Sequence, residues 1–379
     1  MKKIYLDYNA TTPVAPSVVD AMQPFFAEHY GNASSSHSFG RACAEAIEDA
    51  RGKIGLMLGC DTGEIVFTSG GTESNNLAIK GVMFQQGSNV GGHLIISSIE
   101  HPAVTAPARF LERVGFDLTI VDCNEHGVVE PAAIQEAIRP DTKLVSIMHS
   151  NNEIGTIQPI SEISAICRQH KVLLHTDASQ SCGKVALDVE ALGVDMLTIA
   201  GHKFYGPKGV GALYIRTGLS LEPFMHGAGH ERGLRAGTEN TGSIVGLGVA
   251  AKMAAGALNE SYQKMSEMRD ELISRLRETV DGLIVHGEAA ERLPNTLSVS
   301  FPGVSGNDIL ARIPELCAST GSACHSDSGD ASTLQAMGVN PESIRGTIRL
   351  TVGWHTNMEE IERASNLLID AWENLHQPA

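Results

Sequence analysis

The stretch VLLHTDASQSCGKVALDVEALGVDMLTIAGHKFYGPKGVGALYIR, residues 172–216, decides the fold. It contains the apolar, β-branched runs VLLHTDAS, DMLTIAG and VGALYIR, and polar segments separate them. Runs that are apolar throughout, without alternation, are typical of strands buried on both faces of a parallel sheet. The first two runs end in polar residues or glycine, and open α/β sheets bind ligands at such strand ends.

The same pattern extends toward the N-terminus. EIVFTS (64–69), HLIISS (93–98), DLTIVD (117–122) and KLVSIMHS (143–150) are further strand-like runs. Helical segments separate them, among them TESNNLAIKGVMF (72–84) and a helix near 131–138. This alternation predicts an α/β fold with a mostly parallel seven-stranded sheet that helices cover on both faces.

The pattern changes near residue 255. Residues 241–280 are typical of a nearly continuous helix, broken around Asn259. The strand-like runs GLIVHG, NTLSVSF and TIRLTVG follow, and an amphipathic helix from Met358 to about Leu375 closes the chain. We therefore expect a large domain over residues 16–255, and a smaller α+β domain formed by residues 1–15 and 256–379.

Composition excludes several classes of protein. The 379 residues are 42% hydrophobic and 19% charged, as in globular proteins, and the net charge of −16 argues against nucleic-acid and anionic-membrane partners. The seven cysteines are scattered without a CxxC pair, which argues against a disulfide scaffold or a metal site. With no signal-peptide pattern and no apolar run of membrane-spanning length, we expect a cytoplasmic protein.

Polar residues follow several of these strands in turn. SGGTESN brings Gly71 and Thr72 to a helix start, where backbone N–H groups favour a phosphate, although a simple turn with an N-cap has the same pattern. His101, Asp177 and Lys203 follow later strands. A buried carboxylate needs a cationic partner, and a lysine in such a site can bind an aldehyde covalently.

One ligand accounts for all these strand ends. Pyridoxal 5′-phosphate has a phosphate for the helix start, a basic ring nitrogen for Asp177, a flat face for His101 and an aldehyde for Lys203. Another phosphate-bearing cofactor, or purely structural roles for these residues, would leave the same pattern.

A separate feature is the stretch CASTGSACHSDSGD, residues 317–330. Cys324 lies there among glycine, serine and aspartate, a composition typical of an exposed loop. Loops carry functional residues more often than core segments do, so this thiol is a candidate functional group.

The chain resembles the cysteine desulfurase and selenocysteine lyase group of fold type I pyridoxal-phosphate enzymes. The resemblance covers nearly the whole chain and rests on the motifs YLDYNATTP, YGNASSSHSFGR, VFTSGGTESNNLAIKG, SIMHSNNEIGTIQPI, HTDASQSCGK, GHKFYGPKGVGALY, GAGHERGLRAGTEN, LPNTLSVSF and GSACHS.

The resemblance implies pyridoxal 5′-phosphate as cofactor and a role for each matching residue. Lys203 is expected to bind the aldehyde, Asp177 the ring nitrogen and Gln180 the phenolic oxygen. His101 is expected to stack on the ring and to move protons. The remaining cofactor contacts implied by the resemblance are Gly71, Thr72, Asn152, His202 and, from the neighbouring subunit of a homodimer, Thr238.

For the substrate, the resemblance implies that Asn152 and Arg349 hold the carboxylate of L-cysteine. Lys203 removes the Cα proton, and Cys324 takes the sulfur as a persulfide and carries it to an acceptor protein, as in iron–sulfur cluster assembly. Either His101 or His325 is expected to activate the Cys324 thiol, and the resemblance does not decide between them. L-alanine is the second product.

Departures from the pattern leave other activities open. Ala200 replaces a hydroxyl residue common in desulfurases, Ala33 a proline, and Trp354 an arginine. CHSDSGD together with Ala200 resembles selenocysteine lyases, which act on L-selenocysteine. An aminotransferase and a non-catalytic scaffold are further alternatives, but the first needs no loop cysteine and the second no intact Lys203.

Overall fold

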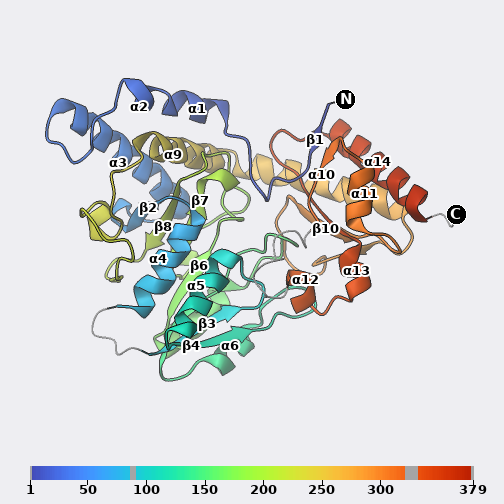
Figure 1. The fold of residues 1–379 in the computed structure, drawn as a ribbon, viewed down its shortest axis with the longest axis horizontal. Helices are drawn as coiled ribbons and strands as arrows, with labels where there is room; N and C mark the ends of the chain where they lie inside the picture. The colour runs from blue at the N-terminus through green and yellow to red at the C-terminus, as the bar shows by residue number, and fades with distance from the viewer. Residues whose placement is uncertain (1, 86–90, 321–331, 377–379) are drawn as a thin grey trace.

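The computed structural model describes residues 2–85, 91–320 and 332–376. Its centre is a seven-stranded sheet with the strand order β2-β8-β7-β6-β5-β3-β4 (Figure 1). β8 runs antiparallel to both neighbours, and all other neighbours are parallel, which confirms the predicted sheet. The strands are β2 (Ile65–Thr68), β3 (His93–Ser97), β4 (Asp117–Val121), β5 (Thr142–Ser146), β6 (Leu173–Asp177), β7 (Met196–Ala200) and β8 (Gly211–Ile215).

Helices cover both faces of this sheet. In β3, Leu94 and Ile96 pack into a core with α4 and α5, while Ile95 packs into the core on the opposite face. Strand side chains alternate between faces, so burial of both faces requires the unbroken apolar runs seen in the sequence. One face carries α4 (Gly71–Met83) and α5 (Pro102–Arg113); the other carries α3 (Ser38–Leu58), α6 (Pro131–Ala137), α7 (Ile160–His170), α8 (Val189–Leu192) and α9 (Thr241–Gly256).

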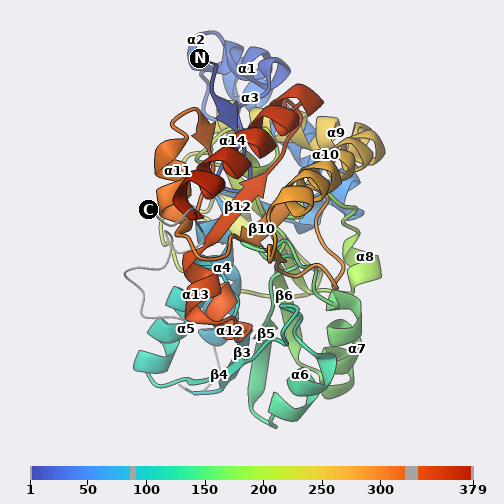
Figure 2. The ribbon, with the colours of Figure 1, turned by 90° about the vertical axis from the view of Figure 1, so that its right-hand side faces the viewer.

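The C-terminal part forms a second apolar core around a three-stranded antiparallel sheet of order β12-β10-β9. Figure 2 shows α10 and α14 next to one another in this part. The predicted helix from Met358 to about Leu375 is confirmed, and the predicted break near Asn259 falls at Ala257. The elements are α10 (Leu258–Thr279), β9 (Ile284–Val285), β10 (Thr296–Ser300), α11 (Gly306–Arg312), α12 (Thr333–Ala336), α13 (Pro341–Arg345), β12 (Thr347–Thr351) and α14 (Met358–His376).

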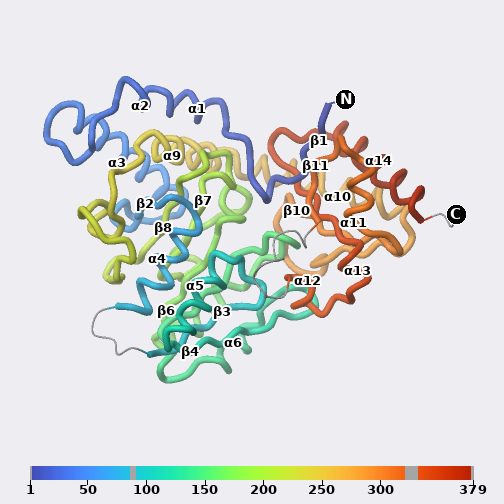
Figure 3. The backbone as a smooth tube through the Cα atoms, viewed as in Figure 1, coloured from blue at the N-terminus to red at the C-terminus, as the bar shows by residue number. Residues whose placement is uncertain are grey.

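The N-terminal segment joins the two parts. β1 (Ile4–Tyr5) pairs in parallel with β11 (Leu316–Cys317), and the chain then crosses to α1 (Pro16–Met22) and α2 (Pro24–Ala27) (Figure 3). Leu6 lies in the core of the C-terminal part and Tyr8 in the core of the large sheet. The division into residues 16–255 and two flanking segments stays a prediction.

Among the described residues, no single helix is both long and apolar enough to cross a membrane. α9 and α10 meet that criterion only as a pair, across a bend of 73° between them.

Candidate active site

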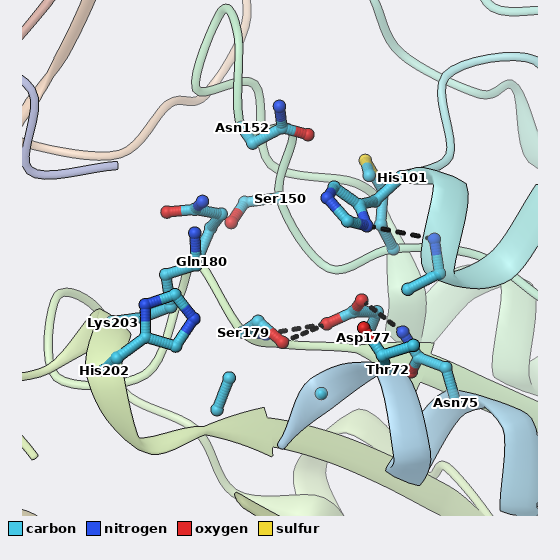
Figure 4. Close-up of a pocket in the computed structure, with 14 residues that line it drawn as sticks. Thr72, Asn75, His101, Ser150, Asn152, Asp177, Ser179, Gln180, His202 and Lys203 are labelled. Carbon is cyan, nitrogen blue, oxygen red and sulfur yellow. Dashed lines mark hydrogen bonds between the residues drawn. The ribbon is translucent and has the colours of Figure 1, made fainter. Parts of the chain in front are cut away.

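A cavity of about 290 Å³ lies at the carboxyl ends of the parallel strands. Its walls come from the residues that follow β2, β3, β5, β6 and β7, as expected for an open α/β sheet. Most of the predicted residues lie together here: Gly71, Thr72, His101, Asn152, Asp177, Gln180, His202 and Lys203 (Figure 4).

Lys203 ends a short 3₁₀ turn, η2 (Gly201–Lys203), directly after β7. Its Nζ donates to the carbonyl oxygens of Asn9 at 2.7 Å and Ala10 at 3.0 Å. The backbone packs so closely after this turn that a Cβ on Gly206 would lie 2.8 Å from the Gly201 carbonyl oxygen. Close packing of this loop therefore fixes where the lysine amine enters the cavity.

The Asp177 carboxylate lies on another wall and is almost fully buried. Asn75 Nδ2 donates to Oδ2 at 2.7 Å, and the Ser179 backbone N–H and hydroxyl donate to Oδ1 at 2.9 and 2.6 Å. All three donors are neutral, and no ion pair to Asp177 is present within the described ranges. A buried carboxylate with only neutral donors favours a basic ligand atom in the cavity.

The N-terminus of α4 supplies a positive end without a side-chain cap. Gly70 precedes it with φ 146°, a conformation open to glycine. A Cβ on Gly71 would approach Ser179 Oγ to 3.1 Å and narrow this corner. The Glu73 carboxylate pairs with Arg235 Nε at 3.0 Å and accepts from the Ser69 backbone N–H at 2.8 Å, so these contacts offset its charge near the helix start.

Two histidines flank the cavity. His101 caps α5, and its Nδ1 accepts from the Ala103 N–H at 3.0 Å, which leaves the ring proton on Nε2 in the neutral form. The second, His202, lies 3.2 Å from Thr11 Oγ1. Burial, together with the charge of Lys203, lowers the pKa of His202 to about 4, so this ring binds as a neutral donor near pH 7.

Arg349 lies just behind the cavity wall rather than in it. Its Nη1 donates to the Asn152 carbonyl oxygen at 3.1 Å and its Nη2 pairs with Asp7 Oδ1 at 2.8 Å. Arg349 Nε is buried and has no hydrogen-bond partner within the described ranges. An anion beside Asn152 would therefore meet a guanidinium that retains donor capacity.

Thr238, another predicted residue, is exposed and does not line the cavity in its own chain. Cys324 lies outside the described residues. Trp354, a departure from the family pattern, stacks on Tyr205 with 3.8 Å between ring centroids, and the backbone N–H of Trp354 donates to the Tyr205 hydroxyl.

Sequence reasoning missed several polar residues of the site. Asn75 and Ser179 hold the Asp177 carboxylate, and Asn9 accepts the Lys203 amine. Signals existed for the first two, since Asn75 lies one turn into the helix after the glycines and Asp-Ala-Ser is a common local turn pattern. No local signal marks Asn9, which reaches Lys203 from 194 residues away.

These donors fit pyridoxal 5′-phosphate. The cavity combines a primary amine, a carboxylate that lacks a cationic partner within the described ranges, and an uncapped helix start on separate walls. An aldehyde, a basic ring nitrogen and a phosphate are the groups that match them.

Comparison with known proteins agrees with this geometry. Residues 4–364 match the family model described as Aminotransferase class-V. The chain is 45% identical to the protein named cysteine desulfurase IscS of Dictyoglomus turgidum, covering 97% of this chain and 94% of that one, and 44% identical to a protein of the same name from Methanosarcina thermophila, covering 99% and 93%.

Two solved structures are also similar. One is described as a NifS-like protein, with TM-score 0.90, 36% identity, and coverage of 98% of this chain and 99% of that chain. The other is described as SspA in complex with cysteine, with TM-score 0.83, 39% identity, and coverage of 93% and 99%.

Proposed function

Because this chain belongs to the aminotransferase class-V family, we propose that it is a pyridoxal 5′-phosphate-dependent cysteine desulfurase. L-cysteine and an enzyme thiol give L-alanine and an enzyme persulfide, so no external oxidant is needed. The observation that supports this most is one cavity, lined by Lys203 and Asp177, in a chain with near-full-length relatives of that name.

The cofactor, when bound, supplies an aldehyde that links to amines and a ring that accepts electrons from an adjacent C–H bond. Lys203 holds the amine that binds the aldehyde and that removes the Cα proton of the substrate. Asp177 would keep the ring nitrogen protonated, Gln180 would bind the phenolic oxygen, and His101 would cover the ring. The phosphate would be held by Gly71, Thr72 and His202, with Thr238 of a second subunit.

Asn152 and Arg349 orient the substrate carboxylate. Arg349 already binds the Asn152 carbonyl oxygen, so the two residues act as one unit at the edge of the cavity. A bidentate guanidinium fits a carboxylate, and the Asp7 contact holds the side chain in place until substrate arrives.

Cys324 is the proposed sulfur acceptor. The described residues on either side of segment 321–331 are anchored at the site. Ser319 exchanges two backbone hydrogen bonds with Arg349, and the Thr333 hydroxyl accepts from Asn151 Nδ2. Described residues before and after Cys324 thus lie beside Arg349 and beside Asn151, the neighbour of Asn152. The persulfide passes to an acceptor protein, in iron–sulfur cluster assembly or a related pathway, and we propose a cytoplasmic homodimer.

Selenocysteine lyase activity is the second candidate, favoured by Ala200 in the cavity wall where a hydroxyl is common. The deciding experiment measures L-alanine release from L-cysteine and L-selenocysteine side by side. Comparable rates support the desulfurase. Strong rejection of cysteine supports the lyase, and no alanine from either substrate contradicts both.

Replacement of Cys324 by alanine tests the sulfur acceptor. Cys324→Ala should bind cofactor normally but lose cysteine desulfuration by about a hundredfold or more, because the sulfur then lacks its nucleophile. The measurements are alanine release and persulfide mass on the chain. Cys60→Ala is the matched control, since burial raises the pKa of the Cys60 thiol to about 12 and keeps it unreactive. Wild-type turnover by Cys324→Ala would contradict this role.

A further inference from the structure

A second lysine lies behind the active-site cavity. Lys184 is only 5% exposed, and its Nζ donates to the Gln180 backbone carbonyl oxygen at 2.7 Å. The same Nζ faces Gln180 Oε1 at 3.5 Å. No carboxylate lies within ion-pair distance of Lys184 in the described parts of the chain. This lysine therefore has an environment that a charge-pairing role does not explain.

The contacts of Lys184 orient the Gln180 side chain. A lysine amine offers N–H donors, so the amide oxygen of Gln180 faces it and the amide nitrogen faces the other way. On that other side, Gln180 Nε2 donates to the Asn9 carbonyl oxygen at 2.9 Å. Gln180 also lines the cavity. Lys184 thus holds the backbone of Gln180 and the oxygen end of its side chain.

The Asn9 carbonyl oxygen also accepts the Lys203 amine, at 2.7 Å. Asn9 itself is 1% exposed, and its side chain is hydrogen-bonded to Thr296 and Asn295 in the small sheet region. One continuous hydrogen-bonded network therefore joins Lys184 through Gln180 and Asn9 to Lys203, and Asn9 at its centre is buried. A change at Lys184 reaches the cavity through Gln180.

Lys184 can change its protonation state near neutral pH. Burial, together with repulsion from Lys203, lowers the pKa of Lys184 to about 7. Lys184 shares a small space with Cys182, Tyr8, Tyr205 and Lys203. None of the described residues that line this space is acidic, so an anionic atom in the neighbouring cavity is the group that would favour a positive Lys184.

We propose that Lys184 is a positioning residue for the cofactor: it turns the Gln180 amide so that Nε2, and not Oε1, is offered to the acidic ring oxygen of pyridoxal 5′-phosphate. This inference rests on the cofactor of the proposed function but not on the reaction catalysed.

The test is cofactor affinity of the full-length, cofactor-free chain. Lys184→Met should raise the dissociation constant of pyridoxal 5′-phosphate roughly fivefold, because the Gln180 amide loses its restraint. Lys184→Arg, which keeps the donors, should restore affinity to within about twofold. Lys208→Met is the matched control, since Lys208 lies on the same cavity-side loop but is exposed. Thermal unfolding shows whether each variant folds.

Two comparisons separate positioning from a general packing defect. In a Gln180→Leu background, Lys184→Met should change the dissociation constant by less than about twofold, because the residue it acts through is gone. For 3-deoxypyridoxal 5′-phosphate, which lacks the ring oxygen, wild type and Lys184→Met should bind equally. Multiplicative effects in the double variant, or an equal loss with the analogue, would overturn the inference.

If Lys184→Met does not fold, Lys184→Leu replaces it, since leucine keeps an apolar side chain and offers no donor to Gln180. Wild-type affinity in Lys184→Leu contradicts the inference. A wild-type chain that does not bind pyridoxal 5′-phosphate would overturn the proposed function and the inference together. A wild-type chain that binds it, with variants that bind equally well, overturns the inference alone.

Discussion

At the residue scale, the site depends on how the polar groups of the cavity are held. Asp177 is almost fully buried and is held by three neutral donors, while the Lys203 amine donates to two backbone carbonyl oxygens. Burying a carboxylate without an opposite charge is unfavourable. A ligand with a basic nitrogen beside Asp177 would relieve this cost.

Lys203→Ala should abolish covalent attachment of pyridoxal 5′-phosphate. Borohydride reduction followed by peptide mass spectrometry should find the cofactor on Lys203 in the wild type and nowhere in the variant. Alanine release should fall about a thousandfold or more, because the same amine serves as general base. Lys208→Ala, five positions along the chain and exposed, should behave as wild type. Cofactor trapped on another lysine of the variant would refute the assignment.

At the element scale, α3 and α9 pack closely on the face of the sheet opposite α4. Gly248 in α9 makes this possible, because a Cβ there would lie 2.6 Å from Ala50 Cα and 2.7 Å from Ala50 Cβ. α9 leads from the exposed Thr238 segment, so its position also decides where that segment lies. Glycine at position 248 is therefore needed for close packing of the two helices and not for an unusual backbone conformation.

Gly248→Ala should lower the free energy of unfolding by about 1–3 kcal/mol, because overpacking outweighs the better helix propensity of alanine. Gly52→Ala in α3 is the matched control, since nothing lies within 4 Å of the Cβ it would add. That control should be stabilised by about 0.5–1 kcal/mol. Urea unfolding measures both, and a stabilised Gly248→Ala would disprove close contact between these helices.

At the scale of the whole molecule, the two apolar cores meet around the N-terminal segment. Residues 6–12 contact both the large sheet domain and the C-terminal part. Leu6 is hydrogen-bonded to the three-stranded sheet, and Tyr8 and Thr12 contact the loop after Lys203. The active-site cavity thus depends on segments that are distant in sequence. Thr238 lies outside the cavity of its own chain, and we expect it to contribute to the site of a second subunit.

Mixed dimers test this shared site. Lys203→Ala and Thr238→Ala are each expected to be impaired, but a heterodimer of the two contains one site with both native residues if Thr238 acts on its neighbour. Refolding the two variants together should therefore recover activity toward that of one wild-type site per dimer. The readout is alanine release from mixtures of purified variants, and sedimentation should show twice the chain mass. If mixing restores nothing, Thr238 acts within its own chain or not at all.

Acid should destabilise the whole fold. Burial lowers the pKa of His149, His175, His202 and His286 from 6.5 to about 4. Above pH 6.5 these rings are neutral whether folded or unfolded. As pH falls toward 4, the unfolded chain takes up protons that the folded chain does not, so the free energy of unfolding decreases.

Two carboxyls among the described residues oppose this trend. Burial raises the pKa of Glu100 to about 8 and also raises the pKa of Asp195, and their contribution is lost as pH rises. Two carboxyls do not outweigh four imidazoles. The urea midpoint of the cofactor-free chain should therefore fall between about pH 6.5 and about pH 5. His286→Gln should reduce the slope, and a flat midpoint would contradict the burial of these rings.

The sequence determined the sheet and most of the cavity. Apolar strand runs and the helices between them are local patterns, and parallel strands bring their carboxyl ends to one edge. Gly71, Thr72, His101, Asp177, His202 and Lys203 followed strands in the sequence and share one cavity in the structure.

Only the tertiary structure decided how these residues are held. Asn9 reaches Lys203 across 194 positions, and Arg349 reaches Asn152 across 197. No local sequence pattern predicts the role proposed for Lys184. That role depends on burial behind Gln180 and on the absence of a nearby carboxylate in the described residues. Spacing along a chain reports which residues share a strand end or a helix face. Hydrogen bonds between distant segments depend on how separate elements pack, and no local pattern contains that information.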